Sequence, residues 1–394
     1  ELVRAERDAL GKRTLPMDLV FEDSLIGNSV VLTIDKTIQY TAEKELAEAV
    51  RKSGAKGGTA IVMDPKSGEV LAMANYPQFN PNDLSSASRE ALKNRAIVDT
   101  YEPGSTFKVF LLAAALEEGV VKPGDKIYCE NGSMELAGKV IHDTHKHGTL
   151  TVREIMKFSS NIGSAKIAAK LGKERFYDYI TSFGFGSPTG IELKGEGSGI
   201  LRSMKTWSKL ELANVAFGQG VSATPLQLTS AFSAIANGGY LMKPYLVKDI
   251  LDMDGKVIKS NQPQIVKKVV SAETASKVTE MLRDVVNEGG TGTEAALNGY
   301  DVAGKTGTAQ KVSGGRGYTE NKHVASFIGF VPAELPELVV LVAIDEPEGI
   351  QYGGIVAAPA FKAIAETSLI YLNSPKKNDG QIPAGGVLKV AKLD

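Results

Sequence analysis

The chain has 394 residues, 43% hydrophobic and 23% charged, a composition that predicts a globular protein with one large domain or two. Its 45 lysines and arginines nearly balance its 46 aspartates and glutamates, so we expect no nucleic-acid partner, because a polyanion binder normally carries a basic excess. The single cysteine, Cys129, excludes an internal disulfide and a zinc site built on several thiolates.

The beginning of the chain has the pattern of strands around one helix. After a polar and irregular stretch, Val30–Asp35 predicts a strand and Thr37–Val50 an amphipathic helix. Two β-rich runs follow, at 58–64 and 69–77, and the turn Pro65–Gly68 joins them. Strand patterns this close together, with a turn of this composition, predict an antiparallel hairpin.

The middle of the chain, about 100–288, has mostly helical periodicity that glycine-rich loops interrupt. Three further β-rich runs come next, at 300–312, 323–332 and 338–347, and a last helix is predicted over Ala357–Tyr371. Strand material from both ends of the chain therefore flanks a helical insertion.

These elements predict an α/β fold of the α+β type: an antiparallel sheet flanked by helices, with a helical subdomain inserted at about 100–288. A functional site is expected in the cleft between the two halves. No stretch has the apolar length that a membrane helix requires. Because the chain starts at Glu1 and not at methionine, we expect an excerpt from which an anchor or leader has been removed.

Three short polar motifs occur in a fixed order along the chain. S-T-F-K spans Ser105–Lys108, S-S-N spans Ser159–Asn161 and K-T-G-T spans Lys305–Thr308. S-x-x-K alone is a weak signal, because Ser53–Lys56 and Ser374–Lys377 also match it. Those two lie in polar stretches, whereas the first motif opens a helix that is apolar all round and is therefore expected to be central. The three motifs together are typical of serine β-lactamases and penicillin-binding proteins.

The first motif has the chemistry of an activated serine. Residues i and i+3 of a helix share a face, so the Lys108 amine is expected to reach the Ser105 hydroxyl. The start of a helix supplies free N–H groups, which would make the Ser105 amide one half of an oxyanion hole. Lys108 acts as a base only when neutral, and burial together with a second cation, Lys305, would lower its pKa.

The second motif completes the proton path. The Ser159 hydroxyl can pass a proton between Lys108 and a leaving amine, and the Asn161 side chain can pair with a peptide group of the substrate.

The third motif is expected to bind substrate. Gly304 and Gly307 carry no side chain that would obstruct a peptide, so a substrate could add to this strand, with the Thr308 N–H as the second oxyanion donor. Lys305, Thr306 and Thr308 offer a cation and hydroxyls to a terminal carboxylate. Substrate contacts are therefore assigned to Thr306, Gly307 and Thr308.

Further segments carry a resemblance to a known family. The chain resembles the transpeptidase domain of class B penicillin-binding proteins, especially the cell-division type, from about residue 31 to 371, in LTID, YEPGSTFK, FSSNIGSAK, FGQGVSATPLQL, GKTGTAQK, NKHVASFIGFVP, IDEP and YGGIVAAPAF. The resemblance implies a D,D-transpeptidase that cross-links peptidoglycan stem peptides with D-Ala-D-Ala ends through a serine acyl-enzyme. It also implies acylation by β-lactam antibiotics.

The resemblance further implies a place in the cell and a domain organisation. Such enzymes lie on the outer, periplasmic face of the bacterial cytoplasmic membrane, held by an N-terminal anchor that this chain lacks. We expect residues 1–30 to be a remnant of the N-terminal pedestal, 31–372 the transpeptidase domain and 373–394 a polar tail. A membrane glycosyltransferase and division proteins are expected as partners through the missing segments.

Other functions remain open from the sequence. A D,D-carboxypeptidase or a β-lactamase shares the serine chemistry but hands the acyl group to water, and a β-lactam sensor is acylated without turnover. Glu211 to Asn214 faintly resembles the deacylating motif of class A β-lactamases but lacks its leucine before the asparagine. His142, His145 and His147 suggest a metal loop, but no carboxylate or thiol set fixes a geometry, so no metal and no cofactor is expected.

Overall fold

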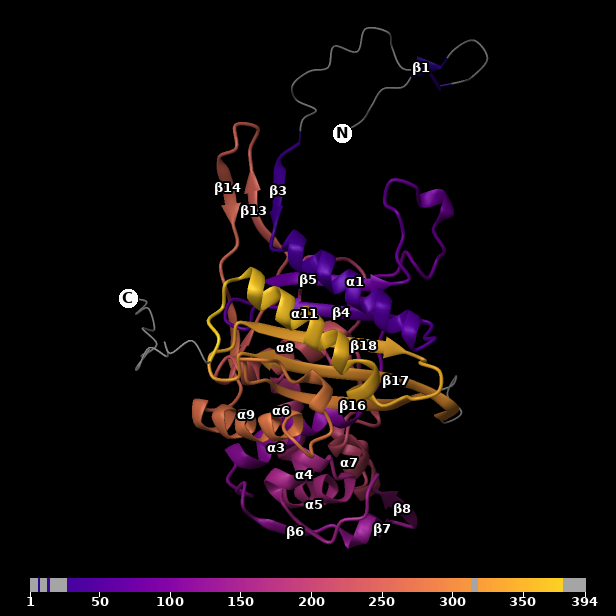
Figure 1. Ribbon diagram of the computed structural model, residues 1–394, viewed down its shortest axis with the longest axis vertical. Coiled ribbons are helices and arrows are strands. Elements are labelled where there is room, and N and C mark those ends of the chain that lie inside the picture. Colours follow the sequence, from indigo (N-terminus) through magenta and orange to yellow (C-terminus); the bar gives the residue numbers. More distant parts are fainter. Residues whose placement is uncertain (1–5, 8–12, 15–26, 313–317, 378–394) are drawn as a thin grey trace. The chain divides into compact units, whose positions relative to one another are not determined.

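The computed structural model describes residues 6–7, 13–14, 27–312 and 318–377 and divides into two compact units (Figure 1). The smaller unit consists of Glu1–Leu32 and Val247–Gln262, and the larger one of Thr33–Leu246 and Pro263–Asp394. Most of the stretch predicted as a pedestal remnant, and residues 378–394 of the predicted tail, lie outside the described residues.

The smaller unit is built from antiparallel strands. A three-stranded sheet has the order β14–β13–β3, and β1 pairs with β2. The predicted strand Val30–Asp35 ends earlier, at Leu32, because the Asp35 side chain accepts hydrogen bonds from Thr37 N and Ile38 N and caps the following helix. The strands are β1 Glu6–Arg7, β2 Arg13–Thr14, β3 Ser29–Leu32, β13 Val247–Leu251 and β14 Val257–Ser260.

The larger unit is organised around a five-stranded antiparallel sheet with the order β16–β17–β18–β4–β5. The central strands read as continuous apolar runs, because both faces of the sheet are covered. The order leaves β16, which carries K-T-G-T, at one edge. The strands are β4 Gly57–Met63, β5 Val70–Tyr76, β16 Ala303–Val312, β17 Tyr318–Val331 and β18 Leu338–Asp345.

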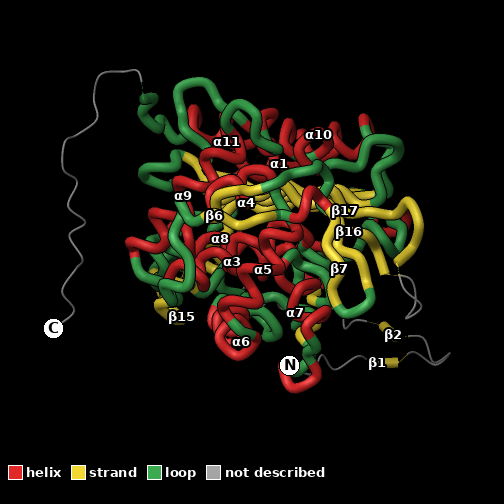
Figure 2. The backbone as a smooth tube through the Cα atoms, turned by 90° about the horizontal axis from the view of Figure 1, so that it is seen from below, coloured by secondary structure: helices red, strands yellow, loops and turns green. Residues whose placement is uncertain are grey.

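Alternate residues of β18 pack into two separate hydrophobic cores, one on each face of the sheet. Val340 and Val342 pack with α1 (Lys36–Lys52) and α11 (Ala358–Tyr371) on one face, while Leu341 packs with the helical subdomain on the other. Figures 1 and 2 show α1 and α11 together on one side of the sheet and the remaining long helices on the other. α11 confirms the predicted last helix to within one residue.

The helical subdomain surrounds α3 (Lys108–Glu117), which is buried on all sides. Phe107 and Phe110 pack there against further aromatic rings at centroid distances near 5 Å. The other helices of the larger unit are α2 Arg95–Val98, α4 Val152–Phe158, α5 Asn161–Leu171, α6 Lys173–Ser182, α7 Lys209–Ala216, α8 Pro225–Ala236, α9 Ala272–Val286 and α10 Gly353–Val356.

The larger unit also contains short strands and 3-10 turns, most of them within the helical subdomain. Four two-stranded antiparallel pairs were not predicted as such: β6–β9, β7–β8, β10–β11 and β12–β15 have too few residues for a clear alternation. Their bounds are β6 Lys126–Tyr128, β7 Ser133–Leu136, β8 Lys139–His142, β9 Thr149–Thr151, β10 Ile200–Leu201, β11 Val221–Ser222, β12 Tyr240–Met242 and β15 Ile265–Lys268. The 3-10 turns are η2 Leu84–Ser86, η3 Gly104–Phe107, η4 Glu130–Gly132, η5 Met204–Thr206 and η6 Thr293–Ala295.

The predicted fold class is confirmed: an antiparallel sheet is flanked by helices and carries an inserted helical subdomain. Within the described residues, no helix combines the length and apolarity needed to cross a membrane. The predicted domain boundaries at 31 and 372 remain a prediction.

Candidate active site

Ser105 lies in a tight turn that precedes the central helix. It belongs to the 3-10 turn η3, so the predicted helix start at Ser105 is wrong by one turn, and α3 itself begins at Lys108. Gly104 has φ +56°, and its N–H donates to Gly218 O at 3.1 Å. A side chain on Gly218 would collide with the Gly104 carbonyl oxygen, so a glycine is required where these two loops meet.

Lys108 is fully buried and makes three hydrogen bonds with the second motif. Its Nζ donates to Ser159 O at 2.5 Å, to Ser159 Oγ at 3.1 Å and to Asn161 Oδ1 at 2.7 Å. These hydrogen bonds of Lys108 Nζ go to the second motif, and the predicted approach of Lys108 to the Ser105 hydroxyl stays a prediction. Burial first, and the positive charge of Lys305 second, hold the pKa of Lys108 well below its usual value, while Asp143 opposes them.

The S-S-N motif forms the junction between two helices. Ser159 ends α4 in a left-handed conformation, with φ 60°, and Ser160 caps α5, whose first residue is Asn161. A non-glycine residue rarely adopts such a backbone, and strain of this kind gathers at functional sites. The turn points the Ser159 hydroxyl at Lys108 and Lys305, each with its Nζ 3.1 Å away.

Asp143 is a residue of this site that sequence reasoning missed. Its carboxylate accepts hydrogen bonds from Ser160 Oγ at 2.6 Å, Asn161 N at 2.5 Å and Ile162 N at 3.0 Å. The neighbouring His142 carbonyl accepts from Asn161 Nδ2 at 2.8 Å. The loop after β8 therefore fixes the start of α5 and the orientation of the Asn161 amide.

The rest of that loop packs against the same helix junction. The His147 ring stacks on Phe158 with centroids 5.0 Å apart, next to Ser159. Among the described residues no three histidine, cysteine, aspartate or glutamate side chains are grouped so as to hold a metal ion.

Lys305 reaches the same hydroxyl from the sheet. It is fully buried in β16, and its Nζ donates to Ser159 Oγ at 3.1 Å and to Thr306 O at 3.2 Å. Burial lowers the pKa of Lys305 to about 7. Two amines of lowered pKa therefore meet at one serine hydroxyl.

The glycines of β16 serve packing as well as access. A Cβ on Gly304 would lie 2.5 Å from the Phe327 ring, and one on Gly307 would collide with the Ser326 hydroxyl and lie 3.1 Å from the carbonyl of Pro103, just before the Ser105 turn. β16 must therefore lack these side chains to lie close to β17 and to the turn that carries the serine.

The hydroxyls of the two threonines of β16 have partners in neighbouring segments, and Lys305 Nζ also lies 3.4 Å from Thr306 Oγ1. Thr306 Oγ1 is 3.0 Å from Thr291 Oγ1, and Gly353 N donates to Thr308 Oγ1 at 3.4 Å. Both threonines thus lie beside the open edge of the sheet, where the K-T-G-T motif was expected to bind substrate.

The residue that faintly suggested a deacylating base has another role. Glu211 forms a capping box with Ser208: its carboxylate accepts from Ser208 N at 2.8 Å, and Ser208 Oγ accepts from Glu211 N at 3.2 Å. Helix capping accounts fully for this glutamate.

Comparison with known proteins agrees with this geometry. The family model for the penicillin binding protein transpeptidase domain matches residues 58–366. Stage V sporulation protein D of Bacillus subtilis is 43% identical over 382 residues, which cover 95% of this chain and 59% of that relative. The probable peptidoglycan D,D-transpeptidase PenA of Neisseria flavescens is 39% identical over 353 residues, covering 89% of this chain and 85% of that relative.

Solved structures of penicillin-binding proteins are similar to this chain in both fold and sequence. The apo transpeptidase domain of penicillin-binding protein 3 from Burkholderia pseudomallei has a TM-score of 0.78 at 38% identity, covering 88% of this chain and 97% of that one. Penicillin-binding protein 3 of Mycobacterium tuberculosis in complex with aztreonam has a TM-score of 0.83 at 36% identity, with coverages of 89% and 80%. The chain belongs to the family of penicillin-binding protein transpeptidase domains, in the class B branch that its sequence predicts.

Proposed function

We propose that this chain is the catalytic domain of a peptidoglycan D,D-transpeptidase and that it works through an acyl-enzyme on Ser105. The observation that carries the proposal is the pair of buried lysines, Lys108 and Lys305, which share the Ser159 hydroxyl. A buried lysine without a carboxylate partner is costly, and an enzyme gains a base from it.

In the first half of the reaction Ser105 Oγ attacks the carbonyl carbon of the penultimate D-alanine of a donor stem peptide. The serine proton passes to neutral Lys108 Nζ, whose distance to the hydroxyl shortens once substrate is bound. The backbone N–H groups of Ser105 and Thr308 stabilise the tetrahedral oxyanion.

Collapse of this intermediate breaks the C–N bond to the terminal D-alanine. The leaving amine takes the proton from Lys108 by way of the Ser159 hydroxyl, which already accepts from Lys108. In the second half an acceptor amine attacks the ester carbonyl, Lys108 takes its proton, and Ser105 recovers a proton as the new amide forms.

Substrate recognition follows the open edge of the sheet. A donor peptide would lie along β16, with its carboxylate on Thr306, Thr308 and the charged form of Lys305, and with a peptide group on Asn161. β-lactam antibiotics would acylate Ser105 in the same way, since they also present a carbonyl next to a carboxylate.

The location of the protein and its partners are part of the same proposal. The chain spans 59% of the length of the sporulation protein it matches, so the remaining length of such proteins would carry the membrane anchor, the pedestal and the contacts with a glycosyltransferase and division proteins. Residues 31–372 would form the catalytic domain on the periplasmic side of the cytoplasmic membrane.

The test is the mass of the intact protein after incubation with benzylpenicillin, followed over hours. We expect a stable adduct that peptide mapping places on Ser105 and that Ser105→Ala abolishes. An adduct on another serine contradicts the assignment of the nucleophile, and an adduct that disappears quickly indicates a β-lactamase.

A second measurement separates the remaining alternatives. A donor ending in D-Ala-D-Ala is supplied with and without an acceptor amine, and the products are separated by chromatography. Cross-linked product supports the transpeptidase, whereas release of D-alanine by water alone indicates a carboxypeptidase, and acylation without either product indicates a sensor.

A further inference from the structure

A pocket in the larger unit lies beside the two-stranded sheet β12–β15, apart from the catalytic residues. It has a volume of about 310 Å³, at the lower end of the range for ligand pockets. The end of α6 with its following loop, α8 and the two strands form its wall, and no residue of the three motifs lines it. Its apolar lining residues are Phe183, Pro188, Leu241, Met242, Pro244 and Val266.

Ser230 gives this pocket a hydroxyl that nothing else in the described chain uses. Its neighbours on α8 satisfy their hydroxyls within the helix, since Thr229 donates to Pro225 O at 2.8 Å and Ser233 to Thr229 O at 2.9 Å. Ser230 lines the pocket, is only 4% exposed, and its Oγ has no hydrogen-bond partner among the described residues. A buried hydroxyl in that state favours a ligand with a polar tip.

The strand that borders the pocket has an open edge. β15 pairs only with β12 among the described strands, and Figure 2 shows it at the periphery of the larger unit. Ile265 and Val266 are each 57% exposed, and Val266 also lines the pocket. An edge strand with exposed apolar side chains is a template for the addition of another strand.

The positive charge near the open edge of β15 favours one kind of added strand over another. Among the described residues no carboxylate forms an ion pair with Lys243, Lys267 or Lys268, although the charge of Lys268 acts on the Glu117 carboxylate. The Lys267 Nζ donates to Ser182 Oγ at 2.7 Å, and the Lys268 Nζ lies 5.4 Å from the centre of the Tyr240 ring. Two copies of this edge would repel each other, whereas a strand rich in carboxylates would be attracted.

We propose that β15 and the pocket beside it bind an extended acidic peptide of a partner protein. The peptide adds to β15 as a third strand and places one tyrosine in the pocket, with the ring against the apolar wall and the phenol bonded to Ser230. Because side chains alternate along a strand, its glutamates face away from the pocket and lie beside Lys268, whereas Lys267 is on the pocket side. This binding involves none of the catalytic residues, so its test is independent of the proposed reaction.

The test uses a fluorescein-labelled, blocked heptapeptide in which glutamates alternate with valine, tyrosine and valine, titrated with the 394-residue chain by fluorescence anisotropy. We expect saturable binding that is roughly threefold tighter than for the same peptide with phenylalanine, because one hydrogen bond is lost. Ser230→Ala removes that preference. Lys268→Glu weakens binding roughly fivefold, while the exposed control Lys362→Glu leaves it unchanged.

Each variant is first checked for penicillin acylation and for thermal unfolding, because none of the replaced residues belongs to the three motifs and a folded protein should keep both. The proposal is overturned if the peptide does not bind at millimolar concentration, or if both charge reversals act alike. It is also overturned if N-acetyltyrosinamide alone binds as well as the peptide, which indicates a small-molecule site. Dimerisation of the chain that Val266→Asp abolishes would assign the edge to a second copy instead.

Discussion

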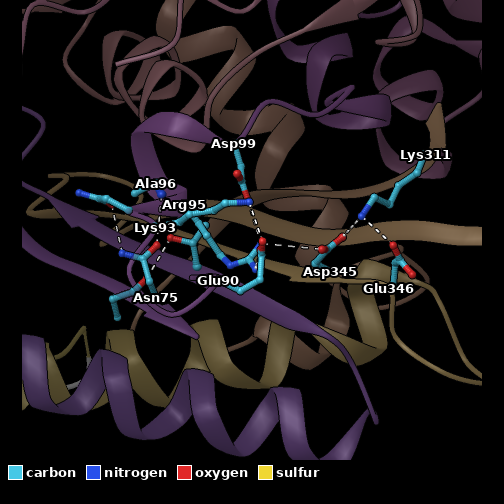
Figure 3. A network of polar contacts seen from close by, with 12 residues as sticks. Asn75, Glu90, Lys93, Arg95, Ala96, Asp99, Lys311, Asp345 and Glu346 are labelled. Atoms are coloured by element: carbon cyan, nitrogen blue, oxygen red, sulfur yellow. Dashed lines mark hydrogen bonds and ion pairs between the residues drawn. The ribbon is translucent and has the colours of Figure 1, made fainter. Parts of the chain in front are cut away.

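Two lysines of the same strand differ in what surrounds them. Lys305 and Lys311 both belong to β16, but Lys305 is buried among hydroxyls and backbone carbonyls, whereas Lys311 donates to Asp345 and Glu346, each at 2.8 Å (Figure 3). Burial lowers the pKa of Lys305 to about 7. Partial burial by itself would lower the pKa of Lys311. The hydrogen bonds and negative charges of Asp345 and Glu346 together exceed that effect, so the pKa of Lys311 is raised.

The surroundings of Lys311 form an ion-pair network that ties a loop to the end of the sheet. Arg95 at the start of α2 donates to Asp99 at 2.8 Å and to Glu90 at 3.0 Å, and its guanidinium is 4.0 Å from Asp345 (Figure 3). Lys311 thus has two carboxylates within hydrogen-bond reach. The buried amine of Lys108 instead bonds to a backbone carbonyl, a hydroxyl and an amide oxygen, and its pKa is lowered by burial and by Lys305, with Asp143 opposing them.

The largest effect should come from replacing the base itself. Lys108→Arg keeps the charge and approximate length, but a guanidinium cannot give up its proton at working pH, so acylation by benzylpenicillin should fall roughly a thousandfold. If the charge of Lys305 binds the substrate carboxylate as proposed, Lys305→Arg should retain measurable acylation, while Lys305→Ala loses much more. Acylation rate constants are compared after circular dichroism has confirmed folding. Equal tolerance of arginine at both positions would refute Lys108 as the base.

The next effect concerns stability and pH. The pKa of Lys305 is about 7 when folded and near 10.5 when unfolded, so between these values the unfolded chain binds the extra proton. Stability should therefore rise with pH across this window, and the cost of burying the amine should be fully present below pH 7 and absent above pH 10.5. Relative to Lys305→Met, the free energy of unfolding should gain about 2 kcal/mol from pH 7 to pH 9.

Denaturant titrations of both proteins at each pH measure this difference, and the titrating groups that Lys305 does not influence cancel in the comparison. Lys108 does not cancel, because the charge of Lys305 lowers its pKa, so the comparison is repeated in the Lys108→Met background. Parallel pH curves for the two proteins in that background would mean that burial does not lower the pKa of Lys305.

A smaller effect is expected at Asp143, which positions the S-S-N motif. Asp143→Asn keeps one acceptor but removes the negative charge that raises the pKa of Lys108, so that pKa should fall further. The acid limb of the acylation rate should move to lower pH, and the maximal rate should fall roughly tenfold as Asn161 loses its orientation. Asp125→Asn, which alters only a local turn in the same subdomain, is the control. A lower rate without a shift of the profile would reduce Asp143 to a structural role.

Sequence reasoning placed the second motif in a loop of the helical region and the third on a strand, as the structure has them, but put the start of the central helix one turn too early. Local patterns suffice for much of this, because the apolar run after Ser105 predicts a buried helix and the β-rich runs near the end of the chain predict strands. The meeting of Lys108 with Ser159 was expected only because the motif set is known as a set.

What sequence reasoning missed depends on contacts between distant segments. Asp143 caps α5 from a loop before α4, and no spacing rule links a carboxylate to a helix start so far along the chain. The same holds for Gly307, whose lack of a side chain was assigned to substrate access, although Ser326 and Pro103 also require it. Such requirements are set by which strands and turns pack together, which periodicity does not specify.

The smallest effect is expected at Lys311, the lysine of β16 that is paired with carboxylates. Lys311→Met removes the amine that joins Asp345 to Glu346, yet Glu346 keeps Lys56 at 2.6 Å and Asp345 keeps Arg95. Because Lys311 is partly open to solvent, the loss should be only about 1 kcal/mol of unfolding free energy, and acylation should stay within about twofold of the parent. The same substitution at Lys305 should do the opposite, raising stability near neutral pH while impairing acylation. Thermal unfolding and acylation rates are measured for Lys311→Met and Lys305→Met. If Lys311→Met loses as much acylation as Lys305→Met, the two ends of β16 do not act independently.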